Sequence, residues 1–173
     1  MKDMDDPSCT LVGRQGYCTQ EMVNLFLIGK AVSNVFNGTV ELGKSGLDGT
    51  TLHGIPEQSD VGFLSLFEHY QSCEVGSHLK NPRNPIWIVL SESHFSVLFA
   101  TCKEVLSLNK DPFHLFYYDG LSRQDEEICL TVDPRGQVFH ESGDSDFVPP
   151  LELCIQTRWK EAAVNWNGTD PLL

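Results

Sequence analysis

The stretch IWIVLSESHFSVLFA, residues 86–100, decides the fold, because two apolar runs flank a short polar break. The runs IWIVL and FSVLFA are rich in β-branched and aromatic residues and nearly continuous, which is typical of strands buried on both faces of a sheet. HLFYY at 114–118 and EICLTV at 127–132 extend the same pattern. The alternation in PPLELCIQTRWK, residues 149–160, predicts one more strand.

The N-terminal half shows helical spacing instead. Apolar residues recur every three or four positions from about Thr19 to Phe36, which predicts a helix that Asn37-Gly38 ends. A second helix is expected to begin at Ser59 or Asp60 and to end near Cys73.

The segments between these elements complete the expected α+β fold, in which helices come first and a largely antiparallel sheet follows. TVEL at 39–42 is strand-like, and the glycine-rich stretch 43–56 is expected to be an exposed connector. Residues 1–14 are expected to form an acidic leader without stable structure, and residues 15–173 a single domain.

Composition excludes several classes of function. Twelve Lys and Arg against 24 Asp and Glu give a net charge of −12, so nucleic acid is not an expected partner. No apolar stretch approaches the roughly 20 residues of a membrane helix, and the charged N-terminus does not resemble a signal peptide. The six scattered cysteines are read as thiols, so we expect a cytoplasmic or nuclear protein that is neither secreted nor membrane-bound.

His94 is the most informative candidate for chemistry, because it sits between small polar residues and the start of a buried strand. Such a mounting would fix an imidazole while leaving one nitrogen accessible to act as a general base. Asp119 ends the next strand-like run and could orient that imidazole. The alternatives stay open: a structural histidine, and an Asp-Gly turn at Asp119.

The sequence contains two further candidate sites. Cys18 opens the first predicted helix, where a thiol pKa falls, so it is a candidate nucleophile, although a buried structural thiol is the more common reading of such a position. His69, Cys73 and His78 are spaced four and five residues apart but have no clear fourth ligand, so no metal is expected. No nucleotide-binding motif is present, and no cofactor is expected.

Several longer blocks together resemble the C-terminal part of the catalytic domain of the MINDY deubiquitinases. The resemblance runs from about residue 15 to residue 173 and is nearest to the fourth branch of that family, and within it to a paralogue regarded as inactive. The blocks are QGYCTQEMVNLFLIGKAVSNVFNGTVEL, DVGFLSLFEHYQSCEVG, NPIWIVLSESHFSVLF, FYYDGL and VPPLELCIQTRWKEAAVNWNGTDPLL.

The resemblance implies a papain-like cysteine isopeptidase that trims lysine-linked polyubiquitin. His94 matches the general base in the family's HFS motif, and Asp119 lies where such enzymes place the residue that orients the imidazole. The family nucleophile belongs to a QGGPCG-type segment upstream of the matching region, so this chain is expected to be inactive by itself. Cys18 falls in a later helix of the family pattern, which argues against it as the nucleophile.

The expected partner is ubiquitin or polyubiquitin. An alternative is a non-catalytic ubiquitin-binding or scaffolding module. The acidic net charge fits that alternative, because ubiquitin's binding patch is apolar with a basic rim.

Overall fold

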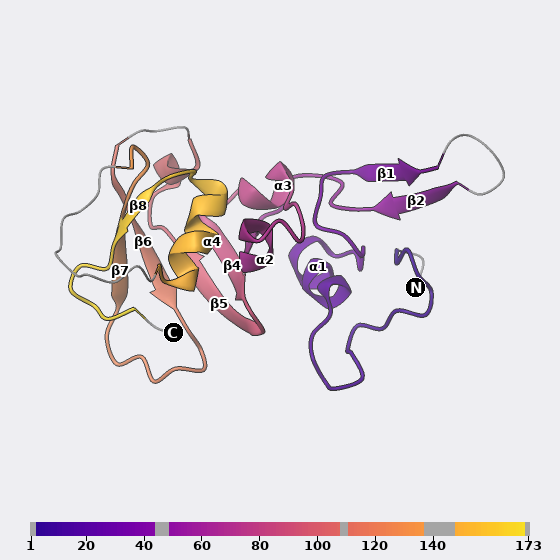
Figure 1. The fold of residues 1–173 in the computed structure, drawn as a ribbon, viewed down its shortest axis with the longest axis horizontal. Helices are drawn as coiled ribbons and strands as arrows, with labels where there is room; N and C mark the ends of the chain where they lie inside the picture. The colour runs from indigo at the N-terminus through magenta and orange to yellow at the C-terminus, as the bar shows by residue number, and fades with distance from the viewer. Residues whose placement is uncertain (1–2, 44–48, 108–110, 137–147, 172–173) are drawn as a thin grey trace.

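The computed structural model describes residues 3–43, 49–107, 111–136 and 148–171. Its centre is a six-stranded sheet in which spatial order follows chain order from β3 to β8 (Figure 1). β3 pairs with β4 in parallel, and the other neighbours are antiparallel. The strands are β3 Gly62–Ser65, β4 Ile86–Ser91, β5 His94–Phe99, β6 Phe113–Tyr118, β7 Ile128–Asp133 and β8 Ala163–Asn165.

The four strands predicted from apolar runs are confirmed as β4 to β7. Alternate side chains of these strands point to one face and build the larger core. Leu98, Leu115 and Leu130 on this face are fully buried. The prediction of an α+β fold is confirmed at this level: the sheet is mixed and open, with few helices.

The strand predicted at 149–160 is wrong, because this segment is the helix α4, Pro150–Arg158. Proline occupies the first turn, where its missing N–H costs nothing. Leu151, Cys154 and Ile155 are buried at helical spacing, and α4 lies against one face of the sheet (Figure 1). The expected order, helices first and sheet after, therefore holds only in part.

The first predicted helix is shorter than expected. Thr19 caps α1, Gln20–Ile28, by accepting a hydrogen bond from the amide of Met22. Gly29 adopts φ 72° and closes the helix, as glycine does at a C-terminal cap. Val32 and Val35, which share the helical spacing, are buried in the following irregular segment.

The second predicted helix is wrong over its first half. Residues 62–65 form β3, in which all four residues are buried, and only Leu66–His69 is helical, as α2. A methyl group on Gly62 would collide with the Trp87 ring on β4, so this parallel pairing depends on glycine. A second short helix, α3 Ser77–Lys80, and a 3₁₀ turn, η1 Lys103–Leu106, complete the helices of the described residues.

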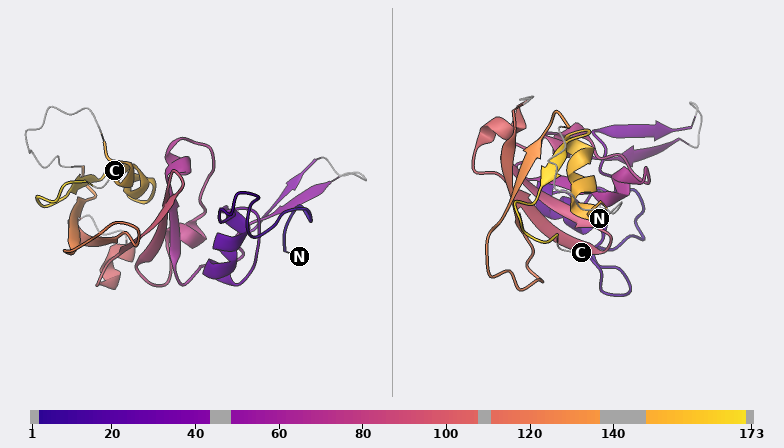
Figure 2. Two further views of the ribbon diagram at one scale, coloured as in Figure 1. Left: turned by 90° about the horizontal axis from the view of Figure 1, so that it is seen from below. Right: turned by 60° about the vertical axis from the view of Figure 1, so that its left-hand side comes forward.

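The stretch 43–56, expected to be a connector, contains a strand. β2, Thr50–His53, pairs with the predicted strand β1, Thr39–Leu42, in a separate two-stranded sheet. This hairpin extends away from the main sheet and is exposed along most of its length (Figure 2). Residues 44–48 lie outside the described residues.

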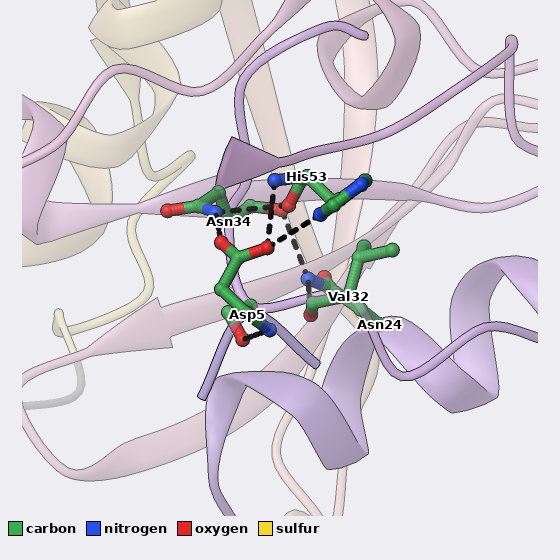
Figure 3. Close-up of polar contacts among 6 residues, drawn as sticks. Asp5, Asn24, Val32, Asn34 and His53 are labelled. Atoms are coloured by element: carbon green, nitrogen blue, oxygen red, sulfur yellow. Dashed lines mark hydrogen bonds and ion pairs between the residues drawn. The ribbon is translucent and has the colours of Figure 1, made fainter. Parts of the chain in front are cut away.

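Asp5 fastens the N-terminal segment to the base of this hairpin (Figure 3). Its carboxylate accepts from the His53 amide at 2.9 Å and from the Asn34 side chain at 2.6 Å, and lies 2.7 Å from Nδ1 of His53. A smaller hydrophobic cluster, which includes Val23, Ile55 and Phe63, lies between this region and the sheet. No helix in the described ranges has the length and apolar character needed to cross a membrane.

Candidate active site

His94 begins β5, directly after the turn that joins it to β4. Ser91 and His94 are the last paired residues of this hairpin, so the turn consists of Glu92 and Ser93 alone. Glu92 adopts φ 55°, a backbone conformation that turns of this kind require. The short turn and the strand hold the imidazole at the end of a central strand, as the sequence predicted.

Asp119 directly follows β6, the strand next to β5. Its Oδ1 lies 2.9 Å from Nε2 of His94 and also accepts a hydrogen bond from the Leu121 amide, at 2.9 Å. The two atoms are at ion-pair distance, but Nε2 of His94 makes no hydrogen bond of acceptable geometry, so the contact is electrostatic. The structure thus brings together the two residues that the sequence suggested as base and orienting carboxylate.

The electrostatics favour an ionised Asp119. Burial opposes ionisation, but the Leu121 amide, the contact with His94 and Ser122 together outweigh it, and the pKa of Asp119 lies below its usual value. The side chain of Asp119 is only 11% exposed, whereas that of His94 is 34% exposed. A negative charge is therefore fixed beside one nitrogen of a ring that solvent and ligands can reach.

Nδ1 is the ring nitrogen left for chemistry, because Nε2 faces Asp119. His94 lines a cavity of about 600 Å³, which lies between the ends of the central strands β4, β5 and β6 and the start of α4. The lining includes Ser91, Ser96, Tyr117, Pro150 and Leu153. This volume is in the range of small-ligand pockets and could take an extended peptide segment.

None of the six cysteines lines the cavity beside His94. Cys18 is exposed, lies just before α1 and does not line the His94 cavity. Burial raises the pKa of the Cys18 thiol, the opposite of activation. Cys154 is fully buried in α4, and burial raises its pKa to about 12. Burial also raises the thiol pKa of Cys9 and Cys129.

The residues considered for metal binding do not form a site. Across the described ranges, no group of three or more His, Cys, Asp or Glu side chains could hold a metal ion. Cys73 lines a separate cavity of about 480 Å³, and burial, followed by the charge of Glu68, raises its pKa. His78 directs Nδ1 to the carbonyl of Ile55, at 3.0 Å, a structural contact.

Sequence reasoning missed the residues that support Asp119. Gln124 accepts a hydrogen bond from the Asp119 amide at 3.1 Å and donates to the Tyr117 carbonyl at 2.9 Å. A glutamine in a polar loop carries no pattern, so only its short distance along the chain from Asp119 could have pointed to it.

Comparison with known proteins identifies the family of the chain. A family model described as "Deubiquitinating enzyme MINDY-3/4, conserved domain" matches residues 1–168. The chain belongs to this family.

Curated MINDY-3/4 relatives place the chain in the fourth branch. The human protein named probable ubiquitin carboxyl-terminal hydrolase MINDY-4 is 57% identical over 174 aligned residues, covering 99% of this chain. The Drosophila melanogaster MINDY-3 homologue, named as a ubiquitin carboxyl-terminal hydrolase, is 42% identical over 79% of the chain and 22% of its own length. The mouse MINDY-3 enzyme is 51% identical over 72% of the chain and 24% of its own length.

The chain spans about a quarter of the MINDY-4 relatives it matches, 23% of the human protein. No solved structure gives a significant match, so the papain-like character of the core stays a prediction.

Proposed function

We propose that this chain carries the general-base part of a MINDY-type thiol isopeptidase site, binds ubiquitin or polyubiquitin, and cleaves no isopeptide bond by itself. The observation that carries the proposal is the contact between His94 and Asp119, both of which line the cavity. The names of the MINDY-4 and MINDY-3 relatives support ubiquitin as the partner.

In this proposal His94 is the base and Asp119 orients it. Nδ1 removes the proton of a cysteine thiol, and the thiolate attacks the carbonyl carbon of the isopeptide bond. The resulting imidazolium returns the proton to the lysine amine as the bond to nitrogen breaks, which leaves a thioester. Asp119 keeps the Nε2 proton in place and stabilises the imidazolium through its charge.

The thiol in this scheme comes from outside the six cysteines of the chain. The raised pKa values of Cys9, Cys18, Cys73, Cys129 and Cys154 all oppose thiolate formation. A base without a nucleophile cannot form the thioester, so the isolated chain is proposed to bind and not to cut. The absence of disulfides among the cysteines supports a reducing location, the cytosol or nucleus.

The experiment combines a reactivity test with a binding test. The purified chain is incubated with ubiquitin carrying a C-terminal thiol-reactive group, and adducts are located by mass spectrometry in the wild type and in His94→Ala. We expect no adduct that depends on His94. Ubiquitin labelled with ¹⁵N is then titrated with the unlabelled chain, and we expect saturable chemical-shift changes.

Each part of the proposal has its own contrary result. An adduct at Cys18 that disappears in His94→Ala would make Cys18 the nucleophile and the chain an enzyme. An unchanged ubiquitin spectrum at a large excess of folded chain would remove the binding claim.

A further inference from the structure

We infer that Gln124 is a positioning residue for the proposed base: its side-chain amide clamps the backbone on both sides of Tyr118 and so aims Asp119 at His94. The inference rests on the proposed function, in which Asp119 orients the ring. Both hydrogen bonds of the Gln124 side chain go to backbone groups, so Gln124 would act on His94 only through Asp119.

The clamp uses both ends of one amide. Oε1 of Gln124 accepts from the Asp119 N–H at 3.1 Å, and Nε2 donates to the Tyr117 carbonyl at 2.9 Å. An amide is the side-chain group that accepts at one atom and donates at the next, so it can serve both backbone groups at once. The side chain is half-buried, like the bonds it makes.

Gln124 binds the backbone at the position where the pairing between β5 and β6 ends. The last residue of β6 in register with β5 is Tyr118, opposite Val97. Asp119 lies one residue beyond, and the residue as a whole is only 8% exposed, so its N–H is a partly buried donor at the point where the ladder ends. Leaving such a donor unpaired costs about 1–3 kcal/mol, which favours a rearranged turn over an empty position.

The turn after β6 contains two other hydrogen bonds, and both join Asp119 to residues that follow it in the chain. The Leu121 amide donates to the Asp119 carboxylate, and the Ser122 hydroxyl donates to the Asp119 carbonyl at 3.4 Å. Both tie Asp119 to residues after it. Gln124 ties it back to the strand, so it links the carboxylate to the rigid sheet that also carries His94.

The test removes the amide and keeps the shape. Gln124→Met is compared with Gln156→Met, because Gln156 is also half-buried and donates to a backbone carbonyl, that of Ala162, after α4. ¹³C spectra follow the Asp119 carboxyl through an acid titration, and ¹⁵N spectra show which ring nitrogen of His94 carries the proton in the neutral state. Both measurements use the intact chain and require no enzymatic activity.

In the wild type we expect the Nε2-protonated tautomer and an Asp119 pKa below its usual value. Gln124→Met is expected to abolish at least half of that downward pKa shift and to add signal from the Nδ1-protonated tautomer. Gln156→Met should leave both readouts unchanged, although it also removes a hydrogen bond. Wild-type values in folded Gln124→Met would overturn the inference.

A second variant keeps the test decisive if Gln124→Met does not fold. In Gln124→Asn the amide is one methylene shorter and cannot span both backbone groups, so the same directions of change are expected. Wild-type readouts in folded Gln124→Asn would overturn the inference as well. Asp119→Asn separates this result from the proposed function: an unchanged His94 tautomer in that variant would remove the orienting role of Asp119 itself.

Discussion

Nε of Arg158 donates to the carbonyl oxygen of Lys80 at 3.0 Å, which ties the last turn of α4 to the end of α3. The same carbonyl accepts from Nε1 of Trp87 at 3.0 Å. Arg158 also lies 4.9 Å from the centre of the Trp159 ring and donates to Leu106 at 3.4 Å. Burial lowers the pKa of Arg158, so backbone carbonyls and an aromatic ring stabilise a partly desolvated cation.

Arg158→Met should therefore reduce the free energy of unfolding by about 1.5–3 kcal/mol, the range for hydrogen bonds that involve a charged group. Urea denaturation followed by circular dichroism measures the change. Arg123→Met is the control, because Arg123 is 90% exposed and its ion pair with Asp125 is 3.6 Å long. Similar effects for the two variants would contradict the role assigned to Arg158.

Leu115 and Leu121 form a matched pair for testing the core. Leu115 is fully buried in β6, whereas Leu121 is 85% exposed. Leu115→Ala should cost about 2–5 kcal/mol through lost transfer energy and the cavity left behind. Leu121→Ala should change stability by less than about 0.5 kcal/mol. Equal losses in denaturant titrations would place Leu115 outside the core.

Asp119 predicts a specific dependence of stability on acid pH. Its folded pKa is depressed relative to the unfolded value of about 3.9, so the folded state binds its proton less readily than the unfolded state. The stabilisation is present above about pH 4 and is lost as the pH falls through the folded pKa. Asp119→Asn should lack this part of the acid loss.

Comparison of the wild type with Asp119→Asn isolates the contribution of Asp119 to acid stability. Asp6 and Asp133 also have lowered pKa values, but they are present in both proteins. The measurement is the free energy of unfolding at several pH values between about 2 and 6. Parallel curves for wild type and Asp119→Asn would show that Asp119 makes no such contribution.

Cys154 should resist alkylation while the protein is folded. Its pKa of about 12 leaves almost no thiolate near neutral pH, and its side chain is fully buried. Cys18 and Cys102 are exposed and should react with iodoacetamide first. Mass spectrometry after timed quenching gives the order, and urea-unfolded protein provides the reference rates. Early modification of Cys154 would mean that α4 opens readily from the sheet.

The strands of the candidate site could be predicted because they are continuous apolar runs, which are typical of buried strands. The apolar runs of β4 and β5 predict buried strands. The polar break between them predicts that His94 lies at the end of a strand. The Asp-Gly step after β6 similarly marks where Asp119 leaves the sheet. That their atoms approach to 2.9 Å depends on the register, which the sequence alone does not fix.

The wrong predictions concern segments whose spacing satisfies two periods at once. Leu151 and Ile155 are four residues apart, which places them on one side of a strand and also on one face of a helix. In the structure Cys154 is buried together with Leu151 and Ile155, which fits a helical face and does not fit the alternation of a strand. β3 was missed because Phe63 and Phe67 also share helical spacing, whereas its parallel partner β4 lies far along the chain.

The strands of the main sheet lie in space in the same order as in the chain, and this order determines which segments are needed to bring His94 and Asp119 together. β4, β5 and β6 are successive neighbours, so the segment from Ile86 to Asp119 contains both members of the pair and every strand needed to join them. Contacts so close in sequence form with little loop-closure entropy. His94 and Asp119 are therefore carried by one continuous run of three neighbouring strands, and their contact requires no pairing with a distant part of the chain.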